Sequence, residues 1–67
     1  MSYGETCGVG DEVLVRVNVG PGKYEDRGVG YVTRVLPGVN RIVEVRFDDG
    51  RTELVGWRNI REPNNDR

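Results

Sequence analysis

The chain has 67 residues, a formal net charge of −1 with 10 basic against 11 acidic residues, one cysteine and no histidine. This length allows one small domain with a compact core, and the balanced charge is unlike that of proteins that bind nucleic acid mainly through phosphate contacts. One thiol without histidine excludes a disulfide and supplies too few ligands for a structural zinc site, and no apolar stretch is long enough to span a membrane. We therefore expect no metal, no cofactor and an intracellular protein, with nucleus or cytoplasm left open.

Both ends of the chain are polar. Residues 1–9 are rich in glycine and predict a flexible N-terminal segment, and residues 63–67 predict a polar tail. Between them, residues 10–62 contain short β-branched stretches separated by Gly, Pro, Asn and Asp, without the 3.6-residue period of an amphipathic helix. The sequence therefore predicts an all-β domain over residues 10–62.

The first predicted strand covers residues 12–17. Val13, Val15 and Val17 alternate with polar or outward positions, which is typical of a strand with one buried face. The Gly-Pro-Gly at residues 20–22 ends this stretch, and the charged residues 23–27 that follow predict a loop.

The second predicted strand covers residues 28–36. Strict alternation fails there, because Val32 and Val35 fall on opposite phases. A β-bulge near Thr33–Arg34 would bring both valines to the core face. Pro37-Gly38 then predicts a type II turn, in which proline suits the second position and glycine the third.

The third and fourth strands form the predicted hairpin around Asp49-Gly50. This dipeptide between two alternating stretches favours a two-residue type I′ turn, and that turn sets the register of the two strands. The expected partners are Asp48 with Arg51, Phe47 with Thr52, Arg46 with Glu53, and Val45 with Leu54. One face of the hairpin is then apolar, and the other carries two pairs of opposite charge.

The end of the domain is predicted to be a 3₁₀ turn and a short last strand. Trp57–Ile60 is too short for an α-helix, Ile60 is expected to plug the core, and Arg61–Glu62 to pair as the last strand. Trp57 points outward if the fourth strand continues straight, and folds over the end of the domain if the chain turns at Gly56. These elements predict a small five-stranded SH3-like (Tudor-like) barrel with one 3₁₀ turn before the last strand. Its expected core is Val13, Val15, Val17, Val32, Val35, Val43, Val45, Phe47, Leu54 and Ile60.

The run Val45–Gly50, followed by Leu54-Val55, Trp57 and Ile60, resembles the second half of a Tudor domain, nearest to the Tudor domains of Polycomb-like chromatin proteins. The first half is compatible, although KOW-type and photosystem-accessory SH3-like barrels match it nearly as well. The likeness spans residues 10–61. It implies an SH3-like barrel, association with chromatin, and recognition of a methylated Lys or Arg by an aromatic cage.

The cage positions of that family are matched here by one aromatic residue. Phe47 stands at one of them, and Val17, Gly28 and Glu53 stand at the other three. A cage in this chain would therefore need Tyr24 or Tyr31.

We expect a non-catalytic interaction module that binds a protein or peptide, which the resemblance implies to be methylated, through aromatic residues at the rim of the barrel. The paired acids Asp48 and Asp49 lie at a hairpin tip without the contrasting environments that acid–base catalysis needs, and Cys7 has no histidine to activate it. The candidate partner-binding residues are Phe47, Tyr31, Trp57, Tyr24 and Asp49.

The alternative function is that of a nucleic-acid-binding domain, or an accessory domain of nucleic-acid machinery. Ten residues are basic, and all except Lys23 are arginines, which suit planar contacts with phosphate. In this interpretation Arg16, Arg46 and Arg58 contact phosphates while exposed aromatic rings stack on bases. Binding would then weaken steeply with added salt.

Overall fold

The computed structural model of the chain describes residues 2–63, and in this range five antiparallel strands form one sheet in the order β4-β3-β2-β1-β5. The elements are α1 (Tyr3–Thr6), β1 (Glu12–Gly20), β2 (Lys23–Leu36), β3 (Ile42–Phe47), β4 (Thr52–Gly56), the 3₁₀ turn η1 (Trp57–Asn59) and β5 (Ile60–Arg61). The all-β class and the 3₁₀ turn before the last strand are confirmed. The sheet is not closed, because β4 and β5 are its two edges, so the expected barrel is not confirmed. None of the helices in this range is long and apolar enough to cross a membrane.

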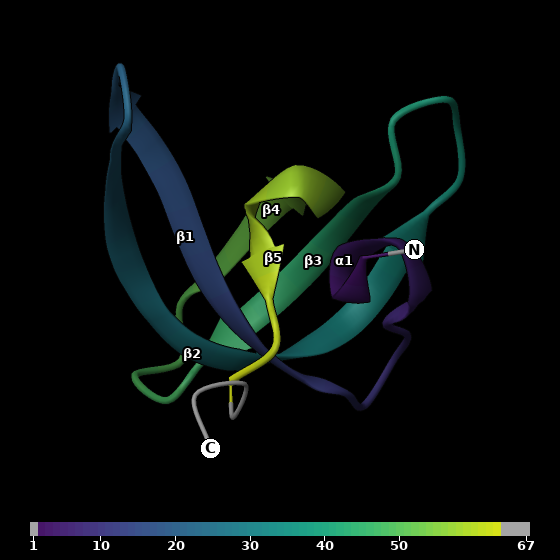
Figure 1. Cartoon of the computed structure of the whole chain (residues 1–67). Helices are drawn as coiled ribbons and strands as arrows, with labels where there is room; N and C mark the ends of the chain where they lie inside the picture. Colours follow the sequence, from purple (N-terminus) through teal and green to yellow (C-terminus); the bar gives the residue numbers. More distant parts are fainter. Residues whose placement is uncertain (1, 64–67) are drawn as a thin grey trace.

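The long strand β2 belongs to both halves of the sheet, which curves around it (Figure 1). Its first part pairs with β1 and its last part with β3, and Gly30 has partners on both sides. A Cβ atom on Gly30 would lie 2.5 Å from the carbonyl oxygen of Arg46 and 2.8 Å from Cγ1 of Val45. Glycine is therefore required at this position of β2, because a larger residue would collide with β3.

The hairpin of β1 and β2 is longer than the sequence predicts. Residues 23–27, expected to be a loop, continue β2 and pair with the end of β1, with Tyr24 opposite Asn18. Figure 1 shows this hairpin projecting beyond the other strands. An ion pair of 2.7 Å joins Arg16 to Asp26 across the two strands, which accounts for charged residues in a paired segment.

The predicted bulge in β2 is confirmed. The pairing with β3 shifts between Val32 and Arg34, so that Val32 and Val35 both face the core side, Val32 fully buried and Val35 partly. After this strand the connection to β3 occupies residues 37–41, which is wider than the expected two-residue turn at Pro37-Gly38.

The register of the β3–β4 hairpin differs by one residue from the prediction. The turn has three residues, 48–50: the N–H of Gly50 donates to the carbonyl of Phe47, and the N–H of Phe47 donates to the carbonyl of Arg51. Only Gly50 has a positive φ in this turn, +89°, whereas the expected type I′ turn also needs one at Asp49. A type I turn followed by a glycine bulge therefore replaces the two-residue turn.

The shift in register exchanges the two faces of β4. Leu54, predicted in the core opposite Val45, is paired with Glu44 and is 60% exposed, and Val55 is buried instead. Arg46 is opposite Thr52, so the expected pair of Arg46 with Glu53 does not form. The predicted pairs of Asp48 with Arg51 and of Phe47 with Thr52 are wrong for the same reason.

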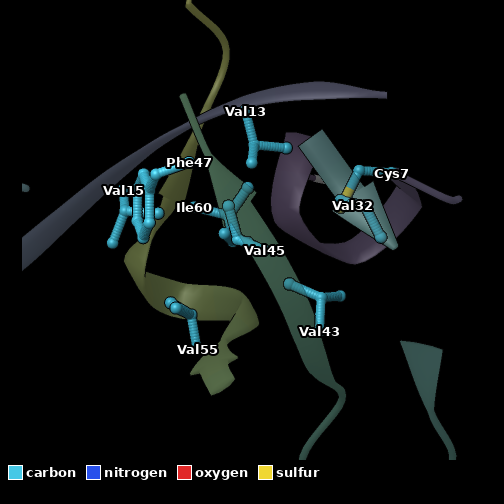
Figure 2. Packing of buried hydrophobic residues seen from close by; sticks show 9 residues of the cluster. All are labelled: Cys7, Val13, Val15, Val32, Val43, Val45, Phe47, Val55 and Ile60. Atoms are coloured by element: carbon cyan, nitrogen blue, oxygen red, sulfur yellow. The ribbon is translucent and has the colours of Figure 1, made fainter. Parts of the chain in front are cut away.

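The core is otherwise close to the expected one, and its side chains converge between the two halves of the curved sheet (Figure 2). Ile60 is almost completely buried, as predicted, and Val17 packs against the core from its margin. The buried apolar residues are Cys7, Val13, Val15, Val32, Val43, Val45, Phe47, Val55 and Ile60.

The N-terminal residues contribute to this core, in contrast to the flexible segment expected over residues 1–9. Tyr3–Thr6 form one helical turn, Tyr3 packs against the core, and Cys7 is only 1% exposed. Of the polar tail expected over residues 63–67, only Pro63 is among the described residues.

Candidate functional site

The five residues predicted to bind a partner do not form one surface. Phe47 ends β3, whereas the backbone N–H of Trp57 is bonded to the carbonyl of Arg41 just before β3 begins. Tyr31 is 50% exposed on the face of the sheet opposite the core, and Tyr24 lies near the tip of the β1–β2 hairpin. Asp49 is in the β3–β4 turn. Arg51 contacts both Phe47 and Asp49, and the other three residues lie elsewhere in the structure.

The ring of Phe47 is enclosed by its own chain. It is 6% exposed, and its Cδ1 would be 3.6 Å from a Cβ atom on Gly28. The guanidinium carbon of Arg51 lies 5.1 Å from the centre of the ring, within the range of cation–π attraction. An internal cation thus lies where a methylated ligand would have to bind.

Ion pairs surround this ring. Glu53 accepts a hydrogen bond of 2.9 Å from Arg27 and lies 3.7 Å from Arg51. Arg51 in turn contacts the carboxylate of Asp49 at 2.9 Å. The backbone N–H of Arg51 also donates to Asp49, which holds the pKa of the Asp49 carboxyl below its usual value. The arrangement stabilises the hairpin and keeps Arg51 over the Phe47 ring.

The three arginines proposed for nucleic-acid binding lie on three different elements. Arg16 is engaged by Asp26 at the base of the projecting hairpin, Arg46 lies beside Tyr31 on the outer face of the sheet, and Arg58 belongs to η1. The hydrogen bond from Arg16 lowers the pKa of Asp26.

Trp57 lines two hollows of the described surface. The chain turns at Gly56, so Trp57 folds over the end of the domain, in agreement with the second of its two expected placements, and its side chain is half-buried. Both hollows are open to solvent and are lined in part by Trp57. The first hollow, of about 440 Å³, is lined by Ser2, Tyr3, Trp57, Arg58, Ile60, Arg61 and Glu62. The second hollow, of about 390 Å³, is lined by Asn40, Gly56, Trp57, Arg58 and Asn59.

The N-terminal turn forms one wall of the first hollow. The hydroxyl of Tyr3 donates a hydrogen bond of 2.6 Å to the carbonyl of Glu12, which fixes the ring beside the sheet. Burial raises the pKa of the Tyr3 hydroxyl, and the negative charge of Asp11 adds to this, so the hydroxyl stays protonated and remains a donor. Ser2 is held by a hydrogen bond of 3.0 Å from its N–H to the carboxylate of Glu5.

Arg41 connects this wall to Trp57. Its guanidinium donates to the carbonyl of Gly4 at 2.9 Å and to the carbonyl of Cys7, and its own carbonyl accepts the N–H of Trp57 at 3.0 Å. Arginine suits this role because its planar group donates to two acceptors at once. Both sides of the first hollow are therefore positioned by one residue.

The two hollows combine flat aromatic surface with hydrogen-bond donors. Among their described lining residues there is one carboxylate, Glu62, and no histidine or cysteine. Within residues 2–63 no three His, Cys, Asp or Glu side chains gather in a way that would hold a metal ion. The described lining residues offer the aromatic surface of Trp57 together with polar groups that can form hydrogen bonds.

Trp57 and Arg58 were predicted from the sequence as candidate binding residues, but the residues that form the other walls of the hollows were not. Tyr3 and Ser2 lie in a segment without hydrophobic periodicity, and the role of Arg41 depends on contacts with residues far away in the chain. A signal was present in Tyr3, since an aromatic residue in a polar terminal segment often packs against a nearby core.

Comparison of the chain with protein-family models finds no match. Comparison with curated proteins also finds no match. Comparison with solved structures finds no match either.

Proposed function

We propose that this chain is a non-catalytic interaction module, with a Tudor-like variant of the SH3-like fold, that binds a protein or peptide segment at the two hollows around Trp57. The setting is intracellular, and chromatin is the location that the Tudor resemblance implies. The observation that carries the proposal is the half-buried ring of Trp57 between two open hollows. Tryptophan is among the residues most enriched at the energetic centres of interfaces.

The strand order supports the proposed fold. β2 is shared by two hairpins, and the short β5 lies beside β1 after a 3₁₀ turn, so that the two edges of the sheet are connected by η1. A barrel of this kind places the 3₁₀ turn at one open end. The same turn carries Trp57.

The choice of Trp57 over Phe47 and Tyr31 rests on access and shape. Phe47 is enclosed by Gly28 and covered by Arg51. Tyr31 is exposed, but neither hollow includes it. A peptide that enters a concave site buries more of its surface per residue than one lying on a flat sheet.

The test is a selection of short random-sequence peptides on the full chain, followed by binding measurements with purified variants. Selected peptides are expected to lose about tenfold or more in affinity for Trp57→Leu and to keep it for Tyr31→Ser, because only the first change removes the central ring. Far-UV circular dichroism establishes that both variants are folded. Equal loss with Tyr31→Ser would move the site to the outer face, and enrichment no greater than in a selection without protein would overturn the proposal.

A further inference from the structure

We infer that the segment bound at Trp57 is anionic: a peptide with an apolar residue beside Asp or Glu, whose carboxylate binds Arg58. This inference rests on the proposed function and adds the chemical class of the ligand. Arg58 lines both hollows, and its guanidinium carbon lies 5.2 Å from the centre of the Trp57 ring.

The geometry of Arg58 is suited to a carboxylate. A guanidinium over an aromatic ring is held in one orientation by cation–π attraction, and the N–H groups in its plane remain available as donors. Because the side chain is ordered before the ligand arrives, less conformational entropy is lost when a two-pronged contact forms. Arg58 itself is exposed, and none of the ion pairs within residues 2–63 involves it.

The backbone under Arg58 is also fixed. Nη1 of Arg61 donates to the carbonyl of Arg58 at 2.6 Å and to that of Ile60 at 3.0 Å. Arg61 thereby holds the 3₁₀ turn against β5 and adds a second positive charge to the first hollow. Glu62 is the one acid among the described lining residues, so two cations face one anion there.

The apolar part of the ligand has a matching surface. Tyr3, Trp57 and Ile60 line the first hollow, next to the two arginines. An apolar side chain placed in this hollow would leave a neighbouring carboxylate within reach of Arg58. In the second hollow, Asn40 and Asn59 offer amide groups to the peptide backbone. The site would thus bind one apolar side chain and one carboxylate of the peptide.

The experiment is to determine the charge of the peptides that the full chain selects, and to repeat the selection with Arg58→Glu. Wild-type selection is expected to enrich Asp and Glu next to an apolar residue, and Arg58→Glu to enrich Lys and Arg instead. Resynthesised acidic peptides should bind Arg58→Gln about tenfold or more weakly than the wild type, and Arg34→Gln equally well. Arg34 is the matched control because it is exposed and outside both hollows.

Each contrary outcome has a distinct meaning. Enriched peptides that are neutral or basic, yet depend on Trp57, would overturn the anionic ligand and leave the proposed function standing. Absence of any enrichment would overturn both. Replacing Glu by phosphoserine in the selected peptides separates a preference for phosphate from one for carboxylate. Tighter binding of a short DNA duplex than of any peptide, abolished by Arg58→Glu, would overturn the assignment to a peptide.

Discussion

Gly4 lies directly against the backbone carbonyl of Trp57. A Cβ atom on Gly4 would collide with the carbonyl oxygen and lie 2.9 Å from the carbonyl carbon. The oxygen and carbon atoms of Trp57 that the Cβ would meet both belong to the backbone, so moving a flexible side chain would not relieve the collision. The contact explains how a single helical turn at the N-terminus is seated so closely against η1, and it makes the geometry around Trp57 depend on residues near the start of the chain.

Replacing Gly4 by alanine is therefore expected to lower the free energy of unfolding by about 1–3 kcal/mol, as overpacking in a closely packed place typically does. Urea denaturation followed by the fluorescence of Trp57 measures the change. Gly8→Ala is the matched control, because a Cβ atom there meets nothing within 4 Å. If the two variants were equally stable, the close approach of Gly4 to η1 would be ruled out.

Arg41 is expected to control access to Cys7. Lysine at this position cannot donate in a plane to the carbonyls of Gly4 and Cys7 together, and we expect Arg41→Lys to lower stability by about 1–3 kcal/mol. The N-terminal turn should then open more often, so a thiol reagent should label native Cys7 about tenfold faster or more. Arg34→Lys, a change at an exposed arginine, serves as the control. An unchanged rate of labelling would contradict the role of Arg41.

The register of the β3–β4 hairpin predicts opposite effects at two adjacent residues. Val55→Ala should lower the free energy of unfolding by roughly 1–3 kcal/mol, because it leaves a cavity beside Val43. Leu54→Ala should change it by no more than about 0.5 kcal/mol, because Leu54 is exposed. Denaturant titrations of the two variants decide the matter. A large loss of stability in Leu54→Ala with a small loss in Val55→Ala would contradict the three-residue turn and support the two-residue turn.

Acid should weaken the β3–β4 turn through Asp49. Its folded pKa is lowered, mainly by the hydrogen bond from the N–H of Arg51, so its carboxylate stabilises the fold above its unfolded pKa of about 4. This contribution disappears as the pH falls through the folded pKa. Asp49→Asn keeps an oxygen acceptor for the Arg51 N–H but no charge. The wild type should therefore lose stability relative to Asp49→Asn on acidification from neutral pH.

Urea midpoints measured across that pH range provide the readout for Asp49. Asp48→Asn, one residue earlier, is the control, because no side-chain hydrogen bond or ion pair of Asp48 is found within residues 2–63. Parallel curves for the wild type and Asp49→Asn would show that the charge of Asp49 does not contribute.

Local patterns predicted the parts of the fold that depend on nearby residues. The alternation of valines, the bulge after Val32 and the 3₁₀ turn at Trp57 all follow from short stretches of sequence. The turn at Asp49-Gly50 did not, since the same dipeptide fits a two-residue turn or the end of a three-residue one. The inward position of Glu53 is tolerated because Arg27, distant in the chain, binds its carboxylate.

The candidate site was predicted only in part for a similar reason. Trp57 and Arg58 are conspicuous by residue type. Ser2 and Tyr3 line the first hollow because Arg41 holds the N-terminal turn in place by hydrogen bonds to the backbone carbonyls of that segment. Every residue has a backbone carbonyl, so these acceptors cannot be recognised from the sequence.

The short pairing of β5 with β1 has a consequence for the order of folding. Every other ladder of the sheet joins neighbours along the chain, whereas this one brings Leu14 to Arg61 and Val15 to Ile60. Hairpins with tight connections close quickly, while joining two distant segments requires a large loss of chain entropy before any contact is gained. We therefore expect Ile60 to dock in the last step of folding, so the surface around Trp57 would be the last part of the molecule to assemble and the first to come apart.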